Sequence, residues 1–219
     1  ITVGSVSTSL ASLGLDVDAD STVTSLSVAH TTPVSIASGK TLSGAITVTA
    51  GSIKLDESGT LGSSVQMGGG TLDADDSLTI SGNIRPCYFD TCNVSSGSPN
   101  EGGNITIDVA SGKTLTYSGD EISLGVGGVA YYTLTLSGGG ILSNTNAFVL
   151  NDADSKLLLN SITVAKVSTS LASLGLDVDD DSTVTSLTVA HTTPVSIASG
   201  KTLSGAITVT AGSIKLGET

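Results

Sequence analysis

The chain has 219 residues, and its composition and charge exclude several classes of protein. Aromatic residues make up 3% and Trp is absent, so large rings cannot fill a thick core as they do in many compact domains. The formal net charge is −12 with eight Lys and Arg, which argues against nucleic-acid binding and against docking on anionic membranes. No apolar run reaches about 18 residues, so we expect no membrane insertion.

The chain repeats itself almost letter for letter. Residues 1–55 return as residues 162–216 at a constant offset of 161 (162 − 1). Self-similarity of this kind predicts a repeat architecture. We therefore expect a single continuous body over 1–219, with a repeat unit of 1–161 and a partial second unit of 162–219. The two copies differ at Gly4/Ala165, Ser5/Lys166, Ala19/Asp180 and Ser27/Thr188.

Short runs that alternate apolar residues with Ser or Thr recur along the chain, as expected for half-buried β-strands. Clusters of Gly, Asp, Asn and Ser separate them and predict turns. The motif SGKTL, at 38–42, 111–115 and 199–203, predicts a glycine turn followed by a Leu that re-enters the core. The expected strands are Leu26–Val28, Val34–Ile36, Ala45–Val48, Ser52–Leu55, Ser64–Met67, Leu78–Ile80, Asn104–Val109, Tyr132–Leu136, Phe148–Leu150 and Ile162–Val164.

The spacing of these strands indicates how they are arranged. Ile46, Val65, Ile84, Ile105 and Ile122 lie roughly 20 residues apart. The sequence therefore predicts an all-β protein, a parallel β-helix (β-solenoid) with right-handed coils of about 20 residues. Two β-sandwich domains are the rival fold, which the lack of Trp and the short strand spacing disfavour.

Residues 85–103 interrupt the coil period and predict a loop insertion from the solenoid wall. Cys87 and Cys92 lie within it, and their spacing favours a disulfide in an oxidising compartment over two free thiols. Arg85, Tyr88 and Phe89 are candidate ligand contacts, because exposed aromatic residues on a pinned loop can anchor sugars or proteins. The alternative is that the two rings fold back over the end of a coil.

An acidic segment occurs once in each copy and is a candidate calcium site. In an extended strand its alternate carboxylates share one face, where they repel each other unless a cation bridges them. The segment lacks the Gly and distal Glu of an EF-hand loop, so a solvated acidic turn is the alternative. The candidate ligands are Asp16, Asp18 and Asp20, and in the second copy Asp177, Asp179 and Asp181.

Nothing in the sequence indicates an active site. His30 and His191 occupy the same repeat position beside a turn-forming Pro, and we interpret them as turn residues. Polysaccharide-cleaving β-helices need paired carboxylates with nearby cations and aromatic residues to stack sugars, whereas Arg85 is the only Arg here. We therefore expect no enzyme activity and no required cofactor, with Ca²⁺ as the one candidate ion.

Three stretches, VSIASGKTLSGAITV, GGTLDADDSLTISGNI and NITIDVASGKTLTYSG, resemble a known group of proteins. They are similar to the passenger regions of bacterial secreted β-helix proteins, including filamentous-haemagglutinin-like exoproteins, autotransporter passengers and repetitive surface adhesins. The resemblance lies in composition and rhythm. It implies a parallel β-helix, export to the outside or the cell surface, and a role in adhesion, matrix or filament building.

We accordingly expect an extracellular structural or adhesive module that forms a rigid rod. Its expected partners are further copies of itself, in a longer array or end to end, and glycans or a host or cell-surface protein. A carbohydrate-binding or carbohydrate-active β-helix is the first alternative. An ice-binding solenoid is the second, because Thr-x-Thr triplets recur, although they do not fall on successive coils.

Overall fold

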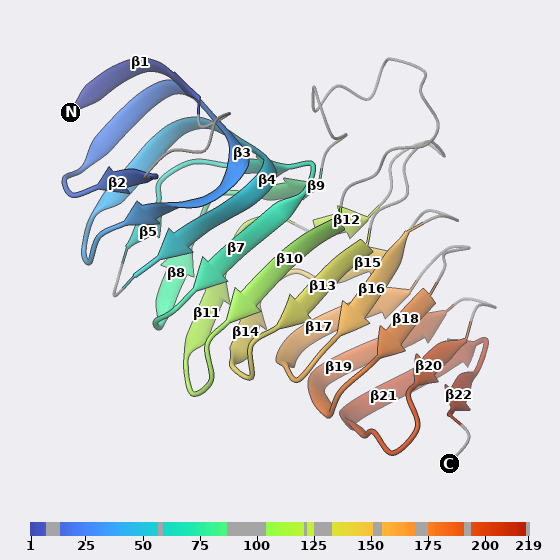
Figure 1. Ribbon diagram of the computed structural model, residues 1–219. Helices are drawn as coiled ribbons and strands as arrows, with labels where there is room; N and C mark the ends of the chain where they lie inside the picture. Colours follow the sequence, from blue (N-terminus) through green and yellow to red (C-terminus); the bar gives the residue numbers. More distant parts are fainter. Residues whose placement is uncertain are drawn as a thin grey trace, which may run out of the picture.

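In the computed structural model (Figure 1), the chain is described over residues 1–7, 14–56, 59–86, 104–120, 122–124, 133–150, 155–169, 175–190 and 194–217. These residues form strands and contain no helix. The strands are β1 (Thr2–Ser7), β2 (Leu15–Val17), β3 (Ser21–Ile36), β4 (Thr41–Leu55), β5 (Thr60–Leu61), β6 (Val65–Met67), β7 (Gly70–Ala74), β8 (Leu78–Ile80), β9 (Ile84–Pro86), β10 (Asn104–Val109), β11 (Thr114–Tyr117), β12 (Ile122–Leu124), β13 (Thr133–Ser137), β14 (Ile141–Asn144), β15 (Phe148–Leu150), β16 (Lys156–Leu159), β17 (Thr163–Thr169), β18 (Gly175–Val178), β19 (Ser182–Ala190), β20 (Val195–Ile197), β21 (Leu203–Ala211) and β22 (Ile214–Leu216).

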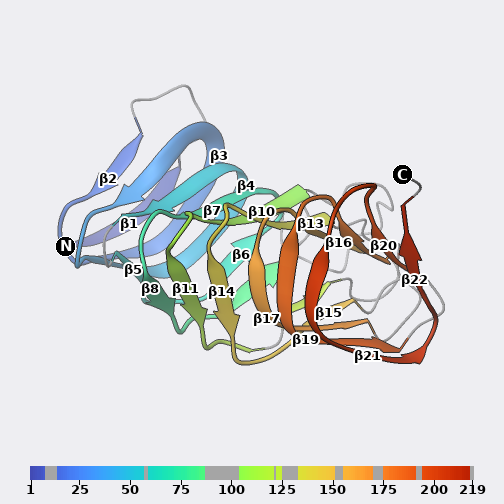
Figure 2. The same cartoon turned by 90° about the horizontal axis from the view of Figure 1, so that it is seen from below.

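The strands wind into a parallel β-solenoid, as the sequence predicts. Each coil has three sides, represented in one coil by β5, β6 and β7 and in the next by β8, β9 and β10; we call them sides 1, 2 and 3. Long strands turn the corners: β3 and β4 each contribute to all three sides, with three register shifts between them. Figure 2 shows the strands of side 1 stacked side by side, and the two chain ends lie at opposite ends of the molecule.

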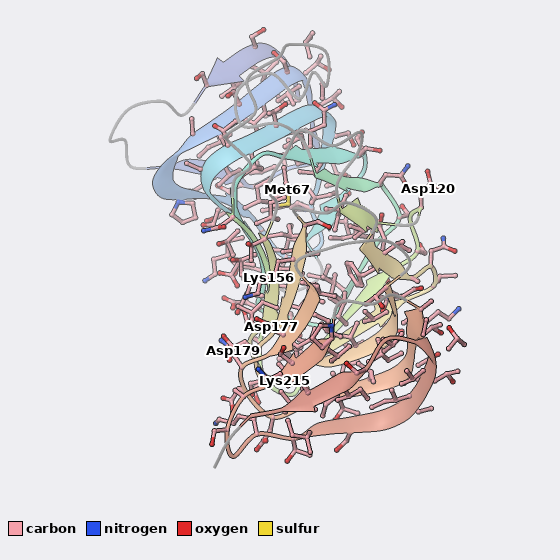
Figure 3. The ribbon with its side chains drawn as sticks, turned by 90° about the vertical axis from the view of Figure 1, so that its right-hand side faces the viewer. Met67, Asp120, Lys156, Asp177, Asp179 and Lys215 are labelled. Atoms are coloured by element: carbon pink, nitrogen blue, oxygen red, sulfur yellow. The ribbon has the colours of Figure 1, made fainter. Side chains whose placement is uncertain are left out.

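The interior is a set of apolar columns that run along the axis. On side 2, Val6 pairs with Leu26 and Leu26 with Ile46, a step of 20 residues (26 − 6 and 46 − 26). Alternate residues face inward, and a fully buried Val, Leu or Ile contributes about 1.5–3 kcal/mol. The sulfur of Met67 lies inside the solenoid (Figure 3). The described column continues through Val65, Ile84, Ile122, Phe148, Val167, Leu187 and Ile207.

Glycines turn the corner between side 3 and the next side 1. The three SGKTL motifs place Gly39, Gly112 and Gly200 at φ values of 67°, 74° and 72°, where a side chain would be strained. In each motif the amide of the following Lys donates to the carbonyl three residues earlier, at 3.0–3.1 Å. The predicted turn is therefore confirmed in all three places.

One position in the predicted column is wrong. Ile105 lies on side 3, in register with Gly70 and Leu134, instead of side 2 with Ile84. Ile84 and Ile105 are 21 residues apart (105 − 84), close to the length of one coil. The 17 residues between β9 and β10 (104 − 86 − 1) take up most of that length, so Ile105 lies on side 3 of the same coil.

The boundary of the predicted insertion also changes. Arg85 and Pro86 belong to β9, where they pair in register with Gln66 and Met67. The solenoid wall therefore continues to Pro86, and the excess chain begins after it. The handedness of the coils stays a prediction.

The second copy of the repeat continues the ladder of the first. β14 and β15 pair with β17, and β16 pairs with β18, all in parallel. Lys166, one of the positions at which the copies differ, donates from Nζ to the carbonyl of Thr145 at 2.7 Å across this junction. The structure thus contains one complete contact between consecutive repeat units.

Candidate functional site

The candidate calcium ligands point away from the core, but they do not converge. Asp16 and Asp18 are exposed beside the buried Val17. The Oδ1 atom of Asp20 accepts a hydrogen bond from the amide of Thr41 in the next coil, at 3.0 Å. No group of three metal-ligating side chains forms among the described residues. Calcium binding here stays a prediction.

The second copy gives the same carboxylates structural partners. Asp181, the counterpart of Asp20, accepts from the amide of Thr202 at 2.8 Å. Asp177 forms an ion pair with Lys156 of the preceding coil, with Nζ 2.6 Å from Oδ2. The acidic segment therefore satisfies a backbone amide at the corner that leads to side 1 and pairs with a lysine on side 3.

The outer surface of side 3 carries a row of charges. Lys54 lies opposite Asp73 in the parallel register and forms an ion pair with Asp75, Nζ to Oδ2 2.8 Å. The hydrogen bond to Asp75 raises the pKa of Lys54. Partial burial, and then the charges of Asp75 and Asp108, raise the pKa of Asp73. On side 3, the stacking of the coils therefore decides which lysine and which aspartate form an ion pair.

This row ends in a shallow hollow near the C-terminal end of the solenoid, with a volume of about 220 Å³. Figure 3 shows Lys156, Asp177, Asp179 and Lys215 following one another along this side. Among the described residues, no buried polar side chain lines the hollow and would define a specific ligand. The lining residues are Asp177, Asp179, Ser196, Ile197, Ala198, Lys215 and Gly217.

The predicted ligand contacts lie mostly outside the described residues. This applies to Tyr88 and Phe89, and to the predicted disulfide between Cys87 and Cys92. The backbone of Arg85 is fixed in β9. The roles assigned to these side chains stay predictions.

The connections from side 2 to side 3 differ from the others in length. They range from 2 residues between β6 and β7 to 17 between β9 and β10. Connections from side 3 to side 1 have only 3–5 residues, and those from side 1 to side 2 have 3–4. One edge of the solenoid therefore accepts all the long excess chain, including the segment of Tyr88 and Phe89.

The threonine triplets do not stack into a flat array. Thr133 and Thr135 in β13 lie between Asn104 and Thr106 on one side, and Lys156 and Leu158 on the other. The hydroxyl of Thr49 instead bonds to the carbonyl of Val28. Single threonines do stack on side 3, where Thr71, Thr106 and Thr135 follow one another in register. Ice binding stays a prediction.

The two end coils have open edges. Residues Thr41–Leu55 and Thr202–Leu216 are identical in sequence, yet β5, β6 and β7 cover only the first set. Val48 and Leu55 are 0% exposed, whereas their copies Val209 and Leu216 are 45% and 71% exposed. At the other end Val3 is 41% exposed, and its copy Val164 is 0% exposed beneath β14.

These end strands mark the clearest difference between the two copies of the repeat. They leave main-chain hydrogen-bonding groups unpaired by any described strand, and such edges are templates for further pairing. The sequence repeat is the signal that reveals them, because it allows the covered and uncovered states of one sequence to be compared.

Comparisons of the chain with known protein families, characterised proteins and experimentally determined structures found no match. Within the described residues, no helix has the length and apolar character needed to cross a membrane. The structure establishes the class of protein as a parallel β-solenoid with coils of about 20 residues.

Proposed function

We propose that this chain is an extracellular structural and adhesive repeat module that forms a rigid rod at a cell surface or in a secreted matrix. The observation that supports the proposal is the continuous parallel ladder across the junction of the two repeat units, formed by β14, β15 and β16 with β17 and β18. Units joined by a ladder share main-chain hydrogen bonds and a core, so they cannot swivel as beads on a flexible linker do.

The proposed mechanism is that of a spacer. Each coil adds about 4.8 Å along the axis, so the length of an array is set by its number of coils. The acidic surface, with a net charge of −12, keeps the rod soluble and repels lateral contact. No catalytic step and no required cofactor are part of this function.

The test is the length of tandem arrays. Chains with one, two or three copies of residues 1–161 ahead of residues 162–219 are compared by electron microscopy and small-angle X-ray scattering. A rigid rod predicts a constant increase in maximum dimension with each unit and no bend at the junctions. Independently oriented globules joined by hinges would refute the proposal.

A second candidate is glycan binding at the edge between sides 2 and 3. It is favoured by the 17-residue connection after β9, which carries Tyr88 and Phe89 on the edge that accepts long connections. Glycan-array binding that is lost in the variants Tyr88→Ala and Phe89→Ala would support it. Binding that persists after deletion of residues 87–103 would reject it.

A further inference from the structure

Strand β10 begins with a triplet of the form Asn-x-Thr. Asn104, Ile105 and Thr106 form this triplet, and its central residue is not Pro. A triplet of this kind is the acceptor that N-linked glycosylation requires. In a chain rich in Ser and Thr such a triplet can arise by chance, so its place in the fold decides whether the asparagine suits a sugar.

The strand presents both polar side chains of the triplet on the outside of the solenoid. Alternate residues of a strand face opposite sides, so Asn104 and Thr106 share the outer face of side 3, whereas Ile105 is 1% exposed and faces the core. Asn104 is exposed and Thr106 is half-buried. Neither side chain forms a hydrogen bond with another described residue. The amide of Asn104 is therefore not held by the fold.

The neighbouring coils leave space around Asn104 for a bulky group. In the preceding coil its neighbour is Gly69, where a Cβ atom would lie 3.8 Å from the carbonyl oxygen of Asn104. Gly69 has no side chain to cover the amide. In the following coil the partner in register is Thr133, whose short side chain is half-buried. Asn104 also directly follows the 17-residue connection after β9, at the edge that accepts the long connections.

The other described asparagines lack one of these properties. Asn160 is exposed, but Ile162 stands where the triplet needs Ser or Thr. A second triplet, at residues 93–95, lies outside the described residues and is not part of the inference. The remaining three donate hydrogen bonds from their side-chain amides within the fold: Asn83, Asn144 and Asn146.

We propose that Asn104 is a site of N-linked glycosylation, and that the co-substrate is a sugar activated on a diphosphate carrier. In the transfer, Asn104 Nδ2 forms a bond to the anomeric carbon of the sugar. The bond from that carbon to the diphosphate oxygen breaks, the diphosphate carrier leaves with the electron pair, and Nδ2 gives one proton to a base of the transferase. The inference rests on the extracellular location in the proposed function, because this modification is typical of secreted chains.

A glycan at this position is compatible with the folded solenoid and adds to its proposed function. It would project from the outer face of side 3, beside the edge with side 2, while Ile105 and Ile107 keep their places in the core. A bulky, hydrated group there opposes lateral contact between rods, as the negative charge of the chain also does.

Peptide mapping of the secreted chain tests the site. The chain is isolated from the cells that produce it, and mass spectrometry with electron-transfer fragmentation locates any sugar on its side chain. Cleavage after Glu101 places Asn93 and Asn104 in different peptides. An added sugar mass on Asn104 is expected. A single sugar residue would indicate a nucleotide diphosphate as the carrier, and a preassembled oligosaccharide would indicate a lipid diphosphate.

Thr106→Val removes the hydroxyl of the triplet and keeps the asparagine. Val suits a strand as well as Thr does, so the variant is expected to fold and to lose the sugar on Asn104. Thr106→Ser retains the hydroxyl and is expected to retain the sugar. The matched control is Thr135→Val, since Thr135 lies in register with Thr106 in the next coil and belongs to no triplet. Circular dichroism checks that all three variants are folded.

Two results would overturn the inference: an unmodified Asn104 in the secreted wild-type chain, or a Thr106→Val variant modified as fully as Thr135→Val. A secreted chain that lacks this sugar and still scatters as a straight rod would reject only the site. A chain that carries the sugar but behaves as hinged globules would reject the rod and retain the site. An unmodified chain that is found only inside the cell would reject the extracellular location together with the site.

Discussion

At the scale of single residues, the tightest positions among the described glycines belong to Gly205 and to its copy in the first unit, Gly44. Its φ is 124°, and a Cβ atom there would collide with the carbonyl oxygen of Val23 in the preceding coil. The register shift between Val23 and Ser25 creates this close approach. A side chain at position 44 is excluded by the positive φ and by the lack of space. The backbones at Gly44 and Val23 cannot move apart without breaking hydrogen bonds between the two coils.

Gly44→Ala is therefore expected to destabilise the fold by at least about 2 kcal/mol. Urea denaturation followed by circular dichroism measures the loss. Gly4→Ala is the matched control, because a Cβ atom at that position would have no neighbour within 4 Å and the second copy already has Ala165 there. Equal midpoints for the two variants would contradict this account of the bulge.

The carboxylates of side 3 give a pH dependence whose sign can be worked out. The pKa of Asp73 is raised, first by partial burial and then by Asp75 and Asp108. The folded chain then binds this proton more tightly than the unfolded chain, so its contribution is favourable at low pH and is lost as the pH rises through the folded pKa. Asp76 behaves oppositely: a hydrogen bond from Lys113 lowers its pKa, so its stabilisation is lost as the pH falls.

Asp73→Asn is accordingly expected to raise stability at pH 7 by about 0.5 kcal/mol, since it removes a like-charge contact. The gain should vanish below the ordinary Asp pKa of 3.8, where the native carboxyl is protonated. Thermal melts across this range check it. Asp76→Asn, the neighbouring control, should lower the melting temperature at pH 7, and a change of the same sign in both variants would count against the assignment.

At the scale of elements, the corner between sides 1 and 2 is held by polar residues that point inward. Tyr117 is 1% exposed, and its hydroxyl accepts a hydrogen bond from the amide of Ile84 at 3.1 Å. Asn144 is 3% exposed and bonds to the next coil: Oδ1 accepts from the amides of Ala165 and Lys166, and Nδ2 donates to the carbonyl of Lys166. A buried side chain here replaces ladder bonds that the corner interrupts.

Asn144→Leu is expected to cost about 2–4 kcal/mol, because it leaves buried amides at the junction of the repeat units without an acceptor. Denaturant unfolding measures the loss. The control is Thr169→Val in the adjoining coil, since the Oγ1 of Thr169 is buried with no hydrogen-bond partner among the described residues. That variant should be unchanged or more stable by about 1 kcal/mol, and a large loss there would show that the junction is sensitive to any substitution.

At the scale of the whole molecule, stability follows from nearest-neighbour contacts between coils. A solenoid behaves as a one-dimensional array, in which an inner coil has two neighbours and an end coil has one. Val48 and Leu55 lie in an inner coil and are completely buried, whereas their copies Val209 and Leu216 lie in the last described coil and are exposed. A second neighbouring coil therefore adds to the apolar area that each coil buries.

Amide hydrogen exchange is therefore expected to be fastest in β1, β2, β21 and β22 and slowest in β7, β10, β13 and β16. The measurement is made at a protein concentration low enough for the chain to be monomeric. Uniform protection along the chain would mean that the solenoid opens as one cooperative unit.

Much of the fold could be predicted from the sequence because local patterns reflect it directly. Alternation at the strands, Gly39 at its turn and the near-20-residue period each depend on residues close together in the chain. The spacing assigns Ile105 to the wrong side, because it does not tell a regular coil from a coil interrupted by an insertion. The role of Asn144 could not be predicted, since its partners lie 21 and 22 residues away on another coil.

Composition and periodicity alone establish that the chain is a repeat, that its core is thin and aliphatic, and that its strands wind with a period of about 20 residues. Which residues face each other between coils is set by the folded solenoid. Its register places Lys54 opposite Asp73 and lets the Nζ of Lys54 form an ion pair with Asp75 at 2.8 Å. Contacts of this kind depend on the stacking of separate coils, which no local pattern in the chain records.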